Sequence, residues 1–242
     1  MKVLIVHAHP EPQSFTGAML GQAVATLTAE HHEVMVSDLY AMGWNPVASA
    51  ADFGVRKNQE YLVYALEQRE NVAAGAIAPD IAGELEKLLA CDLLIFSFPL
   101  FWCSVPAILK GWIDRVFVSG KIYGGQRFYD RGGMCGRRAL LAYSCGGRDY
   151  MFAPHGVHGE MDLMLRHMLR GTLGYAGFEV LPSFVAYHVP YITPEARRAI
   201  LESYDAYLKN LNQLPPLPVP RLADYGADMH PAPPVSRQAS QG

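Results

Sequence analysis

The chain has 242 residues, half of them hydrophobic, and a formal net charge of −3 at neutral pH. This length and composition suit one large globular domain with a sizeable core. The slight acidic excess and the lack of any lysine or arginine cluster exclude the charge pattern of a nucleic-acid-binding protein. The four cysteines have no metal-ligand or disulfide-scaffold spacing, and the opening apolar run is too short for a signal peptide. We therefore expect reduced thiols in a cytoplasmic protein.

Strand-like and helical segments alternate along the chain. Runs of apolar residues predict five strands, at residues 3–6, 34–37, 93–97, 139–144 and 180–186. Helical periodicity lies between and after them, near residues 15–30, 80–90, 106–118, 160–176 and 194–211. This alternation predicts an α/β fold in which a parallel sheet is covered by helices on both faces.

Two segments depart from this alternation. Residues 40–79 form an insertion longer than an ordinary connection, with a helix expected near residues 57–72. Beyond Leu211 prolines recur, and such a segment is extended and cannot form a core of its own. We therefore divide the chain into a domain at residues 1–211 and a proline-rich tail at residues 212–242.

The most informative stretch joins the third predicted strand to the following helix. Pro99 is expected to end the strand and Pro106 to lie in the first turn of the helix, because proline lacks an N–H and has a fixed φ. The loop between them is apolar and carries Trp102. Such a loop favours a flat ring ligand over a charged one.

A membrane span is the alternative for residues 93–109, which carry no charge and approach the necessary length. Two prolines lie within the run, and Leu109, Trp112 and Val116 recur at helical spacing among charged residues. We therefore predict an amphipathic helix whose buried face includes Trp112, and no membrane span.

In an open parallel sheet a ligand binds beyond the carboxyl ends of the strands, where the strand order reverses. For the flavodoxin-like order 2-1-3-4-5, the loops at residues 7–16, 99–104 and 144–147 are expected to meet there. In the first loop, the hydroxyls of Ser14 and Thr16 join free backbone N–H groups at a helix start, which favours a phosphate. No G-x-G-x-x-G or P-loop pattern is present, so neither a Rossmann site nor an NTPase is indicated.

Two other chemistries fit parts of these loops and of the segment at residues 155–158. His7-x-His9 and His155-x-x-His158 resemble metal ligands, but no carboxylate or thiolate completes a recognised spacing, so no metal is expected. Cys145 precedes two glycines as a nucleophile would, yet no G-x-S-x-G-type elbow surrounds it. The glycine pair lets backbone approach a ring closely, although it is also consistent with a plain turn.

Residues and motifs typical of one protein family occur in the family's order between Val3 and about Leu211. They comprise His9 with Ser14-Phe15, residues 37–42, Asn45-Pro46, residues 79–81, Phe98-Pro99-Leu100 with Trp102, residues 105–112, Gly146-Gly147 and residues 156–161. On these motifs the chain resembles the NAD(P)H:quinone oxidoreductase (DT-diaphorase) family, which are flavodoxin-like flavoenzymes that usually work as homodimers. The resemblance implies FAD, or alternatively FMN, that takes a hydride from NAD(P)H and passes it to a quinone in a ping-pong mechanism. It does not cover the tail.

The resemblance also implies roles for individual residues. Those expected to contact the flavin are His9, Ser14, Phe15, Thr16, Pro99, Leu100, Phe101, Trp102, Cys103, Ser144, Cys145, Gly146, Gly147, Arg197 and Leu201. Those expected to shape the nicotinamide and quinone pocket, some of them from the partner subunit, are Trp102, Tyr123, Phe128, Met151, Phe152, His158 and Phe178. Thr16, Phe101 and Cys103 stand where longer members often have Asn, Gln and Phe.

Phe152 is the sharpest departure from the family pattern. Longer members have a Tyr there, which hydrogen-bonds near the N1–C2 edge of the flavin together with the histidine that matches His158. Because Phe152 lacks a hydroxyl, His158 is the expected catalytic residue, since an imidazole donates and accepts protons near neutral pH. Tyr150 is an alternative source of the missing hydroxyl.

Three other functions remain open for a flavodoxin-like chain. One is a flavin-binding regulatory subunit of a potassium efflux transporter, which needs an exposed patch for its partner. A second is an azo- or nitro-compound reductase. The third is an electron-carrier flavodoxin, although the length and the Trp102 loop are unlike those short acidic carriers.

Overall fold

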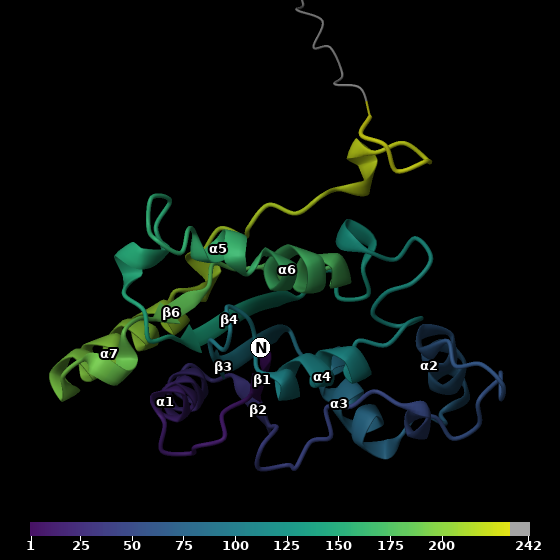
Figure 1. The fold of residues 1–242 in the computed structure, drawn as a ribbon, viewed down its shortest axis with the longest axis horizontal. Helices are drawn as coiled ribbons and strands as arrows, with labels where there is room; N and C mark the ends of the chain where they lie inside the picture. The colour runs from purple at the N-terminus through teal and green to yellow at the C-terminus, as the bar shows by residue number, and fades with distance from the viewer. Residues whose placement is uncertain (233–242) are drawn as a thin grey trace, which may run out of the picture.

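A parallel sheet with helices on both faces forms the centre of the molecule (Figure 1). The structure is a computed structural model that describes residues 1–232; the end of the predicted tail, residues 233–242, lies outside the described residues. The strands are β1 (Lys2–His7), β2 (Glu33–Asp38), β3 (Leu93–Pro99), β4 (Arg138–Ser144), β5 (Glu179–Val180) and β6 (Phe184–Ala186). Their order is β2-β1-β3-β4, and both β5 and β6 pair with β4. The predicted α/β fold with flavodoxin-like order is confirmed.

The sheet differs from the prediction of five strands in one detail. The run at residues 180–186 is divided into β5, which pairs with the start of β4, and β6, which pairs with its end. Pro182 lies between the two pieces and has no N–H to donate to the ladder. One predicted strand is therefore two short ones.

Helices cover the sheet in two groups. They are α1 (Phe15–Ala29), α2 (Tyr64–Ala74), α3 (Pro79–Ala90), α4 (Ala107–Val116), α5 (Met161–Met164), α6 (Arg166–Met168), the π-helix Leu169–Gly174 and α7 (Pro194–Lys209). Figure 1 shows α1 beside α7 on one side of the sheet and α3 beside α4 on the other. The helix expected near residues 160–176 is instead three consecutive short pieces.

The helix of the insertion begins later than predicted, at Tyr64 instead of near residue 57. The Glu67 side chain accepts the backbone N–H groups of Lys57 at 2.8 Å and of Asn58 at 2.9 Å. These bonds hold residues 57 and 58 in a loop folded back over the helix, because a side-chain acceptor competes with helical backbone pairing.

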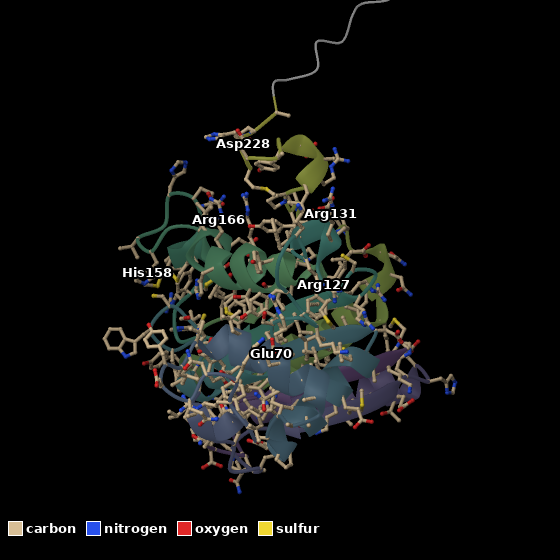
Figure 2. The ribbon with its side chains drawn as sticks, turned by 90° about the vertical axis from the view of Figure 1, so that its right-hand side faces the viewer. Glu70, Arg127, Arg131, His158, Arg166 and Asp228 are labelled. Atoms are coloured by element: carbon tan, nitrogen blue, oxygen red, sulfur yellow. The ribbon has the colours of Figure 1, made fainter. Side chains whose placement is uncertain are left out.

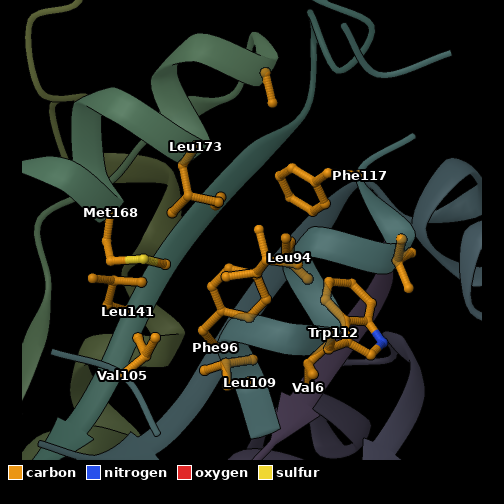
Figure 3. Close-up of a cluster of buried hydrophobic side chains, with 14 of the residues drawn as sticks. Val6, Leu94, Phe96, Val105, Leu109, Trp112, Phe117, Leu141, Met168 and Leu173 are labelled. Atoms are coloured by element: carbon orange, nitrogen blue, oxygen red, sulfur yellow. The ribbon is translucent and has the colours of Figure 1, made fainter. Parts of the chain in front are cut away.

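The core lies between the sheet and these helices. Every residue of β3 is buried, which explains the near-continuous apolar character of that strand. Figure 3 shows Phe96 of β3 against Leu109 and Trp112 of α4, and the rings of Phe96 and Trp112 are 5.8 Å apart. The Trp112 indole donates to Glu84 at 2.8 Å, so its buried N–H is satisfied. The prediction that Trp112 is a core residue is confirmed.

A buried ion-pair network ties the insertion to α4. Arg115 lies 2.8 Å from Asp52 and 2.7 Å from Asp80, and the Tyr64 hydroxyl also donates to Asp52. Burial of Asp52 raises its pKa, but the hydrogen bonds from Arg115 and Tyr64 outweigh burial and hold that pKa below its ordinary value. Asp52 is therefore a charged residue inside the protein.

The described part of the tail lies along the outside of the domain. The Leu217 N–H donates to the Val180 carbonyl at 2.7 Å, and the Leu222 N–H donates to Asp130 at 3.0 Å. Leu222 is the one large apolar side chain of residues 215–232 that is buried. Within residues 1–232, no helix is long and apolar enough to cross a membrane.

Candidate functional site

A cavity of about 390 Å³ lies beyond the carboxyl ends of β1, β3 and β4, where the strand order reverses. Its lining is His9, Ser14, Phe15, Thr16, Pro99, Leu100, Phe101, Ser144, Cys145, Gly146, Val189, Pro190 and Arg197. The three loops that the sequence predicted to meet therefore do meet. Val189 and Pro190 were missed, because no local motif marks them.

The start of α1 forms one end of the cavity. The Ser14 side chain accepts the Gly17 N–H at 3.0 Å, which caps the helix. The N–H groups of Phe15 and Thr16 have no acceptor among residues 1–232. Two unpaired donors at the positive end of a helix dipole form a site that favours an anion such as a phosphate.

His9 adds a third donor to this end. The Glu11 N–H donates to His9 Nδ1 at 3.0 Å, so the proton of a neutral ring lies on Nε2. Burial lowers the pKa of His9 despite the opposing effect of the nearby Glu11 backbone and side chain. The imidazole is therefore a neutral N–H donor at neutral pH.

The apolar wall comes from the loop after β3. Pro99 ends the strand as predicted, and Pro106 is the residue immediately before α4, one position earlier than a first-turn placement. The Leu100 N–H donates to the Ser144 carbonyl at 2.8 Å, which holds this wall beside β4. Leu100 and Phe101 both line the cavity.

Trp102 and Cys103 form the tip of a tight turn. The backbones of Phe101 and Ser104 exchange two hydrogen bonds of 3.0 Å, and the two residues between them have φ values of +48° and +58°. Such a turn normally carries glycine or asparagine, so its conformation is strained for Trp and Cys. Trp102 is 100% exposed. Both residues therefore stand beside the cavity and not in its lining.

The glycine pair after β4 forms the opposite edge. Gly146 lines the cavity, whereas Gly147 packs under Phe152, whose ring Cε2 would be 2.5 Å from any Cβ at that position. The rings of Phe152 and His158 are 5.0 Å apart. Figure 2 shows His158 at the outer edge of the molecule, where its side chain is exposed.

The other predicted pocket residues lie elsewhere in the single chain. Tyr123 and Phe128 pack around Tyr175, at ring distances of 6.3 and 5.6 Å, and do not line the cavity. Phe178 is buried in the core, 6.5 Å from Phe117. Leu201 packs against the core on the α1 side.

Cys145 is a buried thiol in the cavity wall. Burial raises its pKa, so the thiol stays protonated at neutral pH. A nucleophilic role is therefore not favoured, because the thiolate is the reactive form. Among residues 1–232, no three His, Cys, Asp or Glu side chains gather into a candidate metal site.

Residues 1–211 match the family model described as the flavodoxin-like fold. Rat NAD(P)H dehydrogenase (quinone) 1 is 41% identical over 217 residues, which cover 89% of this chain and 79% of the relative. This chain belongs to the NAD(P)H:quinone oxidoreductase family. Another family member, human ribosyldihydronicotinamide dehydrogenase (quinone), is 39% identical over 90% of this chain and 94% of its own length. A solved structure from Klebsiella pneumoniae, described as a quinone reductase, matches with a TM-score of 0.92 and 38% identity over 99% of this chain and 97% of its own.

Proposed function

We propose that this chain is a flavin-dependent NAD(P)H:quinone oxidoreductase, which passes a hydride from NAD(P)H to a quinone by a ping-pong mechanism. One observation carries the proposal: a single cavity joins phosphate-type donors at the start of α1 to an apolar wall and a glycine edge. The quinone reductases among the relatives support this function over a transporter subunit.

The residues of the cavity fit a flavin. The N–H groups of Phe15 and Thr16, with His9, would hold its phosphates. Pro99, Leu100 and Phe101 would lie against the ring. We prefer FAD to FMN because His9 occupies the place where the family holds a pyrophosphate, and Arg197 adds a cation to the lining.

When bound, the flavin supplies the two-electron chemistry, while the protein supplies orientation and electrostatics. The wall at residues 99–101 would cover one face of the bound ring and leave the other for alternating substrates. His158, exposed beside Phe152, is proposed to donate a hydrogen bond or proton that stabilises negative charge on the reduced ring. Trp102, at the tip of its turn, is proposed to border the ring and the substrate.

We propose that the enzyme is a two-fold homodimer with two composite sites. Tyr123 and Phe128 do not reach the cavity of their own chain. The segment of residues 55–66, which leads into α2, carries the exposed apolar residues Val55, Tyr61 and Leu66, which are 76%, 69% and 53% exposed. Exposed apolar residues concentrated in one segment favour a protein contact surface. A second copy would cover it and supply the missing aromatic residues.

We assign the enzyme to the cytoplasm. All four cysteines are free thiols, and Cys103 and Cys135 are exposed to solvent. Unpaired thiols persist in a reducing compartment, which is also where NAD(P)H is available.

The proposal is tested by purifying the chain and examining it for flavin. We expect a yellow protein with one flavin per chain, which mass spectrometry of the released cofactor identifies as FAD. A colourless protein that takes up neither FAD nor FMN on reconstitution would overturn the proposal.

A further inference from the structure

His188 occupies a strained position at the edge of the cavity. It lies between β6 and α7 with φ of 56° and ψ of 23°, a left-handed conformation that is costly for a residue other than glycine. Its backbone N–H donates to the Gly147 carbonyl at 2.8 Å, and its ring Nδ1 is 2.9 Å from the Gly146 carbonyl oxygen. One histidine therefore contacts both carbonyls of the glycine pair.

Arg148 fixes the tautomer of this histidine. The Arg148 Nε lies 3.4 Å from His188 Nε2. A guanidinium only donates and a carbonyl only accepts, so Nε2 must accept from Arg148 while Nδ1 carries the proton toward Gly146. The hydrogen bonds thus run in one direction, from Arg148 through His188 to the Gly146 carbonyl. Bonds in such a chain polarise one another.

The orientation of the Gly146–Gly147 peptide follows from these contacts. No cis peptide occurs among residues 1–232, so the Gly146 carbonyl and the Gly147 N–H point in opposite directions. The His188 ring donates a hydrogen bond to the Gly146 carbonyl, and the Gly147 N–H has no acceptor among residues 1–232. A fixed, unpaired N–H next to a cavity-lining residue is a preorganised donor of the kind that stabilises developing negative charge.

We propose that Arg148 and His188 are positioning residues that hold and polarise the Gly146–Gly147 peptide, so that the Gly147 N–H stabilises the electron-rich edge of the reduced flavin. This inference rests on the proposed function. It gives a physical replacement for the hydroxyl that Phe152 lacks, because a peptide N–H supplies the hydrogen bond without a side-chain donor. Neither residue carried a signal in the sequence, since the contacts join positions about forty residues apart.

The proposal is tested by measuring the reduction potential of the flavin bound to the parent protein and to its variants. His188→Gly removes the ring without strain at positive φ. We expect the protein then to favour reduced over oxidised flavin about tenfold less, which lowers the reduction potential by about 30 mV for a two-electron couple. His188→Asn tolerates the same backbone and places an amide donor near Nδ1, so it should restore the parent potential. Arg148→Leu should shift the potential in the same direction as His188→Gly, by less.

His155→Gly is the matched control, because His155 is an exposed histidine on the neighbouring loop. It should leave the potential unchanged. An unchanged potential in His188→Gly with flavin retained would overturn this inference alone, whereas a parent chain that takes no flavin would overturn the proposed function as well.

A second measurement needs no variant. The ¹⁵N resonances of His188 in the unaltered protein should report a proton on Nδ1. A proton on Nε2 would overturn the proposed direction of the hydrogen bonds, with or without flavin.

Discussion

The Thr16 hydroxyl lies 2.8 Å from the Ser144 hydroxyl, and both side chains are buried. This contact joins the first turn of α1 to the last residue of β4. The phosphate end and the glycine edge of the cavity are thereby held at a fixed separation, which is what a rigid ligand requires.

Thr16→Val should lower both stability and flavin affinity. Valine matches the shape of threonine but leaves the Ser144 hydroxyl without its partner, at a cost of about 1–3 kcal/mol. Urea unfolding and flavin titration measure the two effects. Thr16→Ser keeps the hydroxyl and should retain most of both, and a Val variant as stable as the parent would show that the contact contributes nothing.

Arg115→Met should destabilise the protein by about 3–5 kcal/mol, because it leaves the buried Asp52 charge without its cation. The double variant with Asp52→Asn should recover part of this loss, since no buried carboxylate is then left without a cation; Asp80, the other partner of Arg115, is 45% exposed and stays hydrated. Chemical unfolding at neutral pH measures both variants. Equal stability of Arg115→Met and the parent would contradict a buried ion pair.

Asp52 should also make stability fall in acid. Its pKa is lowered in the folded protein, so its contribution is present above the ordinary carboxylate pKa, near ~4, and is lost as the pH falls through the lower folded value. Asp52→Asn should therefore be less stable than the parent at neutral pH, and the gap should narrow below about pH 4. Urea midpoints across this range check the prediction, and a constant gap would refute it.

His158→Ala should slow flavin reduction by NAD(P)H about 10²-fold with a smaller effect on nucleotide binding, since the lost hydrogen bond acts mainly in the transition state. Stopped-flow absorbance measures the rate. Phe152→Tyr is the companion variant and should match or exceed the parent. Rates within twofold of the parent for His158→Ala would mean that the histidine is structural.

Leu66→Asp should dissociate the proposed dimer. Leu66 is an exposed apolar residue of α2, and a carboxylate there opposes burial against a second copy. Sedimentation should show a parent dimer and a folded variant monomer with reduced activity. Glu202→Gln, at an exposed position of α7 on the opposite face of the sheet, is the control that should remain dimeric. A parent that is fully active as a monomer would rule out composite sites.

The sequence by itself determined the alternation of strands and helices and the buried faces, while its resemblance to a known family supplied the sheet order and so the loops that form the cavity. Burial follows a regular pattern along a strand or helix. The local sequence therefore indicates which side chains are buried in β1, in β3 and in the helix that carries Trp112. Pro99 ended its strand for an equally local reason, the missing N–H. Once the strands are ordered, topology alone brings their carboxyl-end loops together.

Only the tertiary structure decided contacts between distant residues. The late start of α2 depends on where the Glu67 carboxylate reaches, and the exposure of Trp102 depends on a backbone turn that its residue types disfavour. The tautomer of His188 depends on Arg148, forty positions away in the chain. Hydrogen bonds of this kind are set by side-chain geometry after packing, and no local periodicity encodes them.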